Sequence, residues 1–168
     1  MYKFYLIFLL LIAAGHSFAN NIIEGSLGSK IQGEVVLKFN YPWSISFIDN
    51  DHLLVATKPG KLWLVDSFGS KTEVKNIMKV QYGGQGGMGD VVPHPNYKKN
   101  KLIYLSYITS DDGGKTRYAV VDRAKLSDLN SPKLENRQRI WEQFPAVKGK
   151  GHFSHRIVFG PEGSNHEN

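Results

Sequence analysis

The sequence predicts an all-β protein built from repeated antiparallel sheets of about four strands, like the blades of a β-propeller. Past residue 20 there is no helical periodicity, and short runs of β-branched and aromatic residues alternate with Gly, Asp, Asn and Pro. One order recurs: a short run ending in a polar turn (FIDNDH, PHPNYK, FGPEGS), then, in the first two groups, a long apolar strand. A β-sandwich of about eight strands is the alternative, but it does not require the same order twice.

We expect two groups of strands and the beginning of a third. A propeller typically needs about four to eight blades to close. The sequence therefore predicts part of a propeller, truncated to about two blades and the first strand of a third, with closure by oligomerisation as the alternative. The expected strands are residues 43–48, 52–57, 61–66 and 73–77 in the first group, 89–92, 102–109, 117–126 and 139–144 in the second, and 155–159 in the third.

Residues 1–19 have the pattern of a secretory signal peptide. Lys3 precedes an apolar run over residues 4–14, and the segment ends in the small-x-small sequence SFA. The run is too short to span about 30 Å of hydrocarbon comfortably, which disfavours a membrane anchor. We expect cleavage after Ala19, a secreted or periplasmic protein comprising residues 20–168, and no membrane attachment once the signal peptide is removed.

Charge and cysteine content exclude several function classes. The chain has 21 Lys and Arg against 15 Asp and Glu. The basic residues are scattered, as in residues 98–101, and are not concentrated with aromatic residues on one element. We interpret them as solvated loop charges and expect no nucleic-acid partner. With 0 Cys, thiol chemistry, disulfides and cysteine metal sites are excluded.

The segment YGGQGGMGD, residues 82–90, is the first candidate for a functional site. Its glycines permit positive φ angles and the close approach of a flat ligand, and Gln85 is the polar side chain at their centre. The segment is not a phosphate-binding loop, because a Gly-Lys-Ser/Thr end and a following helix are absent. A plain connection between two blades is the alternative that composition alone favours.

His152 is the candidate general base. It lies in a Gly-rich stretch that leads into the expected third blade, as Gln85 does for the second, and in a propeller both stretches reach the axial channel at one face. A neutral His can accept a hydroxyl proton; a structural His bonded to the backbone is the alternative. His155 would face the other side of an extended strand and is expected to be a bystander. His94, between two prolines, is expected to be a rigid turn residue.

Three motifs occur in order: PWSISFIDNDHLLVATKPGKLWLVD, GGQGGMGDVVPHPNY and GHFSHRIVFGPEG. Together they resemble the soluble quinoprotein sugar dehydrogenases, the PQQ-dependent glucose/sorbosone or aldose sugar dehydrogenase family. The resemblance covers residues 35–163, but only the N-terminal third or so of a family member. It implies a six-bladed β-propeller that oxidises aldose sugars at C1 to lactones.

The resemblance also implies roles for individual residues. Gln85 would lie beside cofactor and substrate, and His152 would take the C1 hydroxyl proton while hydride passes to PQQ. A bound Ca²⁺ would polarise the quinone, and an external acceptor would take the electrons. The Ca²⁺ ligands and the residues that clamp the cofactor are expected downstream, so no metal ligand is expected in this chain. The chain departs from the family at Ser154-His155, where many members have Gly-Gly, and at Gly151, where some have Asp or Asn.

Two further hypotheses stay open at the sequence level. A non-catalytic propeller-type module that binds carbohydrate or protein would keep these motifs without the chemistry. The second alternative is that the chain never folds stably, because two blades leave open sheet edges that invite aggregation. By the family hypothesis the 168 residues alone are expected to be inactive, since the groups that orient the base and hold the cofactor lie elsewhere.

Overall fold

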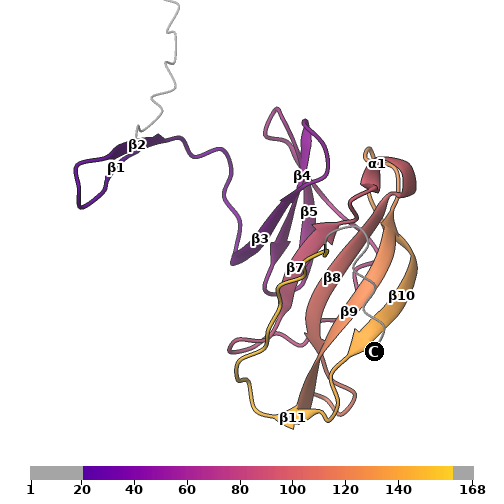
Figure 1. The fold of residues 1–168 in the computed structure, drawn as a ribbon. Helices are drawn as coiled ribbons and strands as arrows, with labels where there is room; N and C mark the ends of the chain where they lie inside the picture. Colours follow the sequence, from indigo (N-terminus) through magenta and orange to yellow (C-terminus); the bar gives the residue numbers. More distant parts are fainter. Residues whose placement is uncertain (1–20, 161–168) are drawn as a thin grey trace, which may run out of the picture. The chain divides into compact units, whose positions relative to one another are not determined.

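The computed structural model describes residues 21–160. The chain divides into two compact units, Met1–Val36 and Leu37–Asn168. The expected signal peptide lies outside the described residues. In the described part of the first unit, β1 (Asn21–Glu24) and β2 (Lys30–Gly33) form an antiparallel hairpin that the sequence pattern did not predict (Figure 1).

The first sheet contains four antiparallel strands in chain order: β3 (Pro42–Phe47), β4 (His52–Thr57), β5 (Lys61–Asp66) and β6 (Lys71–Glu73). Polar turns set the ends of these strands. Between β3 and β4, Asp49 Oδ1 accepts the backbone N–H of His52 (2.7 Å). Between β4 and β5, Gly60 has a φ of 105°, which strains any residue with a Cβ. The first three expected strands of this blade are confirmed.

The second sheet repeats this order with β7 (Met88–Pro93), β8 (Leu102–Thr109), β9 (Thr116–Leu126) and β10 (Leu134–Glu142), while β11 (Val147–Lys148) pairs with β9. The single helical turn α1 (Tyr97–Asn100) is too short to give a periodicity in the sequence. Among the described residues no helix has the length and apolarity to cross a membrane. Two sheets of consecutive strands are the predicted blades, and they do not have the crossed strand order of a sandwich.

The outer strands differ from the prediction. The fourth strand of the first blade is residues 71–73 and not 73–77. Lys75 leaves the sheet because its N–H donates to Pro132 O (2.8 Å) and its carbonyl accepts Leu134 N–H (3.0 Å). These bonds tie the end of the first blade to the beginning of β10. They also explain why β10 begins at Leu134, well before the predicted residue 139.

Residues 155–159, predicted as the first strand of a third blade, form no strand. Side chains along this segment alternate between half-buried and exposed, as they would on an extended chain. Its backbone bonds go to side chains, for example from Ile157 N–H to Asp90 Oδ2 (3.1 Å). The segment therefore has the course of a strand without a hydrogen-bonded partner strand.

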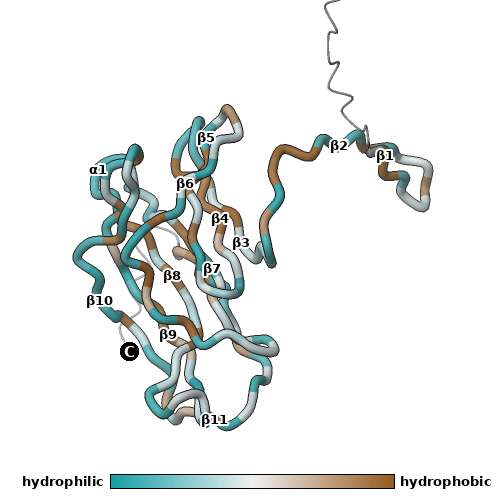
Figure 2. Tube along the Cα trace, turned by 180° about the vertical axis from the view of Figure 1, so that it is seen from behind, coloured by the Kyte–Doolittle hydropathy of each residue, from teal (hydrophilic) through white to brown (hydrophobic). Residues whose placement is uncertain are grey.

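The two blades pack face to face around one hydrophobic core. Their inner strands share no ladder; Ser44 Oγ donates to Gly89 O (3.0 Å) and Ser46 Oγ to Val91 O (2.5 Å). Hydrophobic residues follow the strands, while most turns are hydrophilic (Figure 2). Burial of apolar surface is the main force that holds the blades together. The core includes Leu54, Ala56, Leu62 and Leu64 from the first blade and Met88, Val91, Ile103, Leu105, Val120 and Leu126 from the second.

A buried carboxylate holds the outer strands of the second blade. Asp122 on β9 is 1% exposed. Its Oδ2 accepts Tyr107 OH (2.6 Å) and Arg137 Nη1 (3.1 Å), and its Oδ1 lies 3.4 Å from Arg139 Nε. Burial and the bond to Asp122 raise the pKa of Tyr107 to about 12. Tyr107 therefore remains a donor, and the buried charge has the donors it requires.

Replacing Asp122 by Asn is expected to lower the free energy of unfolding by about 2–3 kcal/mol, because bonds to a buried charge are lost. Urea unfolding measures this change. Glu135→Gln is the matched control, since Glu135 pairs with Lys133 at the surface (3.0 Å) and such pairs contribute at most about 1 kcal/mol. Equal stability of the two variants would contradict the role of the Asp122 cluster.

Candidate functional site

Three connections meet at one end of the blades: the β4–β5 turn, the Gly-rich loop and the segment after β11. Lys58 Nζ in the turn donates to Gly84 O in the loop (3.0 Å). Gln85 N–H in the loop donates to Lys150 O in the segment (3.1 Å). The Gly-rich loop and the segment that carries His152 are therefore adjacent. This is the arrangement that propeller geometry predicts for their backbones.

The chain's own backbone requires glycine in this loop. Gly87 has a φ of 145°, and a Cβ at this position would collide with the carbonyl oxygen of Lys58. Met88 N–H donates to the same carbonyl (2.9 Å). At Gly84, where φ is 57°, a Cβ would lie 2.6 Å from Lys150 O. The close approach that the sequence predicts for a flat ligand is thus made, within this chain, by neighbouring backbone segments.

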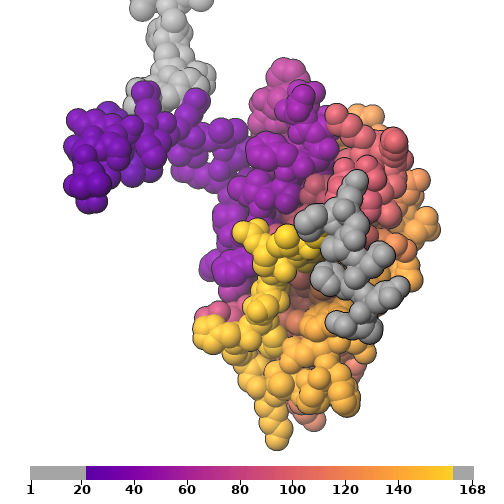
Figure 3. Space-filling view, in the orientation of Figure 1, coloured from indigo at the N-terminus to yellow at the C-terminus, as the bar shows by residue number. Residues whose placement is uncertain are grey.

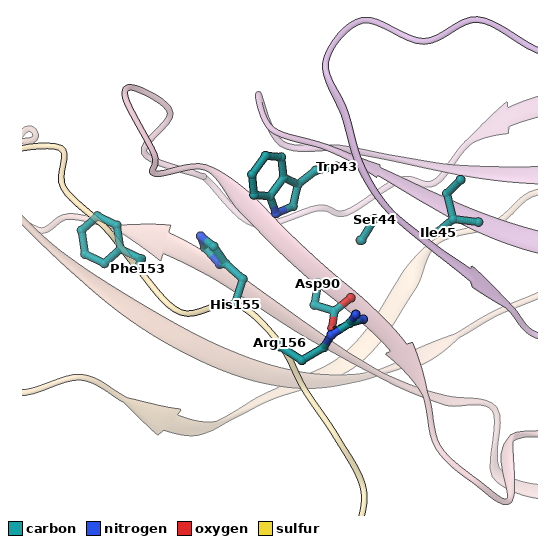
Figure 4. A pocket seen from close by; sticks show the side chains of 7 residues that line it. All are labelled: Trp43, Ser44, Ile45, Asp90, Phe153, His155 and Arg156. Carbon is teal, nitrogen blue, oxygen red and sulfur yellow. Dashed lines mark ion pairs between the residues drawn. The ribbon is translucent and has the colours of Figure 1, made fainter. Parts of the chain in front are cut away.

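A pocket of about 450 Å³ lies between the inner strands and the extended segment (Figure 4). In the space-filling view the yellow residues of this segment lie beside the purple residues of the first blade (Figure 3). Figure 4 shows the His155 ring between Phe153 and Trp43, and the Arg156 side chain beside Asp90. The lining residues are Trp43, Ser44 and Ile45 of β3, Asp90 of β7, and Phe153, His155 and Arg156.

Asp90 and Ser106 anchor the extended segment on the second blade. Asp90 is 6% exposed, and its Oδ2 accepts Ile157 N–H (3.1 Å) and lies 3.9 Å from Arg156 Nη1. Ser106 Oγ accepts Asp90 N–H (2.8 Å) and donates to His155 O (2.6 Å). A buried carboxylate needs such donors, so these two side chains fix the segment where no ladder forms.

His155, predicted to be a bystander, lines this pocket, which sequence reasoning did not predict. Its ring packs on β7, where a Cβ at Gly89 would collide with it. Burial lowers the pKa of His155; a hydrogen bond with the Gln85 backbone raises it, the positive charge of Lys58 lowers it, and the charge of Asp90 raises it. The sequence did hold one signal, the histidine where many family members have glycine.

The side chains of the two predicted site residues, His152 and Gln85, have fewer contacts than that of His155. His152 is exposed, and none of the side-chain hydrogen bonds in the described part of the chain involves it. The Gln85 side chain is also exposed, and it is the backbone of Gln85 that bonds to Lys150 (3.1 Å). The roles of Gln85 and His152 stay predictions. His94 Nδ1 accepts Asn96 N–H (2.9 Å), as expected of a turn residue.

Cations beside an aromatic ring would suit an anionic, planar cofactor. Lys58 Nζ lies 4.7 Å from the centre of a Trp43 ring, and Lys150 packs against the Gly-rich loop at Gly84. Within residues 21–160 neither lysine forms an ion pair. Lys58, Lys150 and Trp43 therefore place positive charge and an aromatic ring together at this end of the blades. No group of three or more His, Asp or Glu able to hold a metal occurs in this described region, and Ca²⁺ ligands downstream remain an expectation.

Stability is expected to fall as the pH drops below about 6.5, because His155 has a lower pKa in the folded chain than in the unfolded chain. At a pH between the folded-state and unfolded-state pKa of His155, the unfolded chain binds more protons than the folded chain, so acid favours unfolding. The free energy of unfolding is therefore highest above the unfolded-state pKa. Urea unfolding at about pH 8 and about pH 5 measures this. His155→Gln should reduce the pH dependence, and His152→Gln, an exposed control, should not. An unchanged pH dependence in His155→Gln would contradict this prediction.

The two blades, with a pocket at their inner strands, define part of a β-propeller, and solved structures agree. The soluble aldose sugar dehydrogenase of Escherichia coli, in the apo-form, superposes with a TM-score of 0.65 at 28% identity, covering 71% of this chain and 35% of that one. A glucose dehydrogenase superposes with a TM-score of 0.64 at 30% sequence identity, covering 69% of this chain and 34% of that one. The PQQ-bound aldose sugar dehydrogenase of Streptomyces coelicolor superposes with a TM-score of 0.61 at 26% sequence identity, covering 74% of this chain and 36% of that one. The predicted fold class is confirmed.

The glucose/sorbosone dehydrogenase family matches residues 39–165, and the chain belongs to this family. Aldose sugar dehydrogenase YliI of Escherichia coli (strain K12) is 32% identical over 129 residues, which are 75% of this chain and 34% of that protein. The uncharacterized protein slr1608 of Synechocystis is 26% identical over 140 residues, which cover 76% of this chain and 32% of that protein. The family resemblance is confirmed, and the chain spans about a third of the length of these curated relatives.

Proposed function

We propose that this chain is part of an exported, PQQ-dependent dehydrogenase that oxidises aldoses at C1 to lactones and passes the electrons to an external acceptor. Membership of the glucose/sorbosone dehydrogenase family supports sugar oxidation, and the PQQ-bound relative of Streptomyces coelicolor supports the cofactor. One observation carries the proposal. The bond from Gln85 N–H to Lys150 O (3.1 Å) brings two motifs that are far apart in the sequence together.

In this proposal His152 is the general base. It takes the proton of the C1 hydroxyl as C1 gives up a hydride, so the aldose loses two electrons and two hydrogens and becomes a lactone. PQQ, when bound, supplies the two-electron acceptor for that hydride. The amide of Gln85 would bind substrate and cofactor, and Lys58 and Trp43 would contact the cofactor's carboxylates and ring. Orientation of the His152 ring needs a further group from the rest of the propeller.

Export is part of the proposal, because residues 1–19 carry a charged start, an apolar run and a small-x-small end. The exported protein is expected to begin at Asn20. N-terminal sequencing of protein from the periplasm or the medium tests this. An exported chain that still begins at Met1 would contradict cleavage.

A chimera tests the catalytic role. The matching part of the Escherichia coli aldose sugar dehydrogenase is replaced by residues 37–160, and dye reduction by glucose is followed with PQQ and Ca²⁺ present. Aldose- and PQQ-dependent dye reduction is expected. His152→Asn should lower kcat by about 10²–10⁴-fold, the usual contribution of a general base. His94→Asn, a change at a turn histidine, is the matched control.

The outcome separates the catalytic hypothesis from the binding hypothesis. A folded chimera that binds PQQ and glucose without reducing dye would contradict the catalytic role and favour a non-catalytic carbohydrate-binding module. Equal rates for the chimera and its His152→Asn variant would show that His152 is not the base. Circular dichroism and PQQ binding are measured first, so that a misfolded chimera is not scored as inactive.

A further inference from the structure

Arg117 on β9 is a buried cation without a carboxylate partner. It is 7% exposed, and within residues 21–160 it takes part in no ion pair. Its Nε is buried and has no hydrogen-bond partner in the same part of the chain. Burying a charge costs free energy unless the charge is hydrogen-bonded. The bonds that the rest of the guanidinium makes therefore have to offset this cost.

The guanidinium of Arg117 bonds to the segment after β11. Its Nη1 donates to the carbonyl oxygen of Gly149 (2.7 Å), and β11 pairs with β9 where Val147 lies opposite Arg117. Gly114 in the β8–β9 turn leaves room for the guanidinium, because its φ is 92° and a Cβ there would lie only 3.4 Å from Arg117 Nη2. The glycine turn and the strand pairing therefore aim a charged donor at the backbone of this segment.

Two consecutive carbonyls of the segment are held just before His152. The first is that of Gly149, which accepts the bond from β9. The second is that of Lys150, which accepts Gln85 N–H from the Gly-rich loop (3.1 Å). His152 follows two residues later, and its own side chain is exposed. The place of His152 therefore depends on how the backbone before it is held.

We propose that Arg117 is a positioning residue, whose bond to Gly149 O holds the segment after β11 against the Gly-rich loop and so sets the place of His152. A charged donor suits this task, because hydrogen bonds to ionised groups are about twice as strong as neutral ones. Gly149 is exposed, so without this bond water would solvate its carbonyl and the segment would be free to leave the loop. The effect on catalysis rests on the proposed function, whereas the effect on the segment does not.

Amide hydrogen exchange of the purified full chain, followed by NMR, tests the effect on the segment. Arg117→Met keeps an unbranched apolar stem and removes the donors. It is expected to lower the protection factor of Gln85 N–H by roughly tenfold, the effect of losing one hydrogen bond from a charged group. The urea midpoint of unfolding should not fall, because an apolar side chain replaces a buried charge.

Arg123→Met is the matched control, because Arg123 lies on the same strand but bonds to Gln138 Oε1 at the surface (2.7 Å). It should leave Gln85 N–H as protected as in the wild type. Met88 N–H, which bonds to the β4–β5 turn, is the internal control and should stay protected in both variants. The inference is overturned if Arg117→Met leaves Gln85 N–H fully protected, or if the control variant lowers its protection equally. It is also overturned if the urea midpoint falls or if Met88 loses protection too, since either result indicates general destabilisation.

The chimera with residues 37–160 tests the effect on catalysis. Arg117→Met is expected to lower kcat by roughly tenfold or more, the effect of a misplaced reacting group, with a smaller change in KM. In the His152→Asn chimera the same substitution should have no further effect, because a residue that acts through His152 has nothing left to position. Equal losses of kcat in both backgrounds would overturn the catalytic part. A chimera that oxidises no aldose would contradict the proposed function, and the hydrogen exchange result would still decide whether Arg117 holds the segment.

Discussion

The contact on which the rest of the structure depends joins Lys58 to the beginning of β7. The Lys58 carbonyl accepts Met88 N–H (2.9 Å), and Gly87 approaches the same carbonyl so closely that no Cβ fits. The inner strands of the two blades share no ladder. This contact, together with the hydroxyl bonds from Ser44 and Ser46 to β7 (3.0 and 2.5 Å), therefore sets how the blades lie against each other. Buried hydrophobic side chains from both sheets then fill the space between them.

The same contact decides where the candidate site lies. With β7 held against the β4–β5 turn, the Gly-rich loop has to cross the end of the two blades. Gly84 lets the segment after β11 pass directly over that loop, with Lys150 in contact. The glycines therefore serve the packing of the chain first, and in doing so they let the loop that carries Gln85 touch the segment that carries His152. This explains why a plain connection and a site-forming loop could not be separated by composition alone.

Strands could be predicted from the sequence where their partners are neighbours along the chain. The hairpins β4–β5 and β8–β9 follow from apolar runs joined by Gly-containing turns. The predictions for residues 73–77 and 155–159 were wrong because hydrogen bonds to distant residues replace a ladder there, and no local pattern encodes such bonds. The adjacency of the segments bearing Gln85 and His152 could be predicted, since the sequence pattern places both at the entry to successive blades. The contacts of His155 could not, because spacing shows only which side of the chain it faces.

The outer face of β3 bears on what completes the site. Trp43, Ile45 and Phe47 alternate with the two serines and are 51%, 62% and 69% exposed. An apolar row of this kind is a packing surface, and in a propeller each blade packs against a neighbour on both faces. We infer that a further blade of the kind present in the longer relatives covers this row. Because Trp43 also lines the pocket, covering it would exclude water from the surroundings of Lys58 and His155. The proposed role of His152 as a base requires preorganised, poorly hydrated surroundings, so under that proposal the packing that closes the propeller would also complete the site.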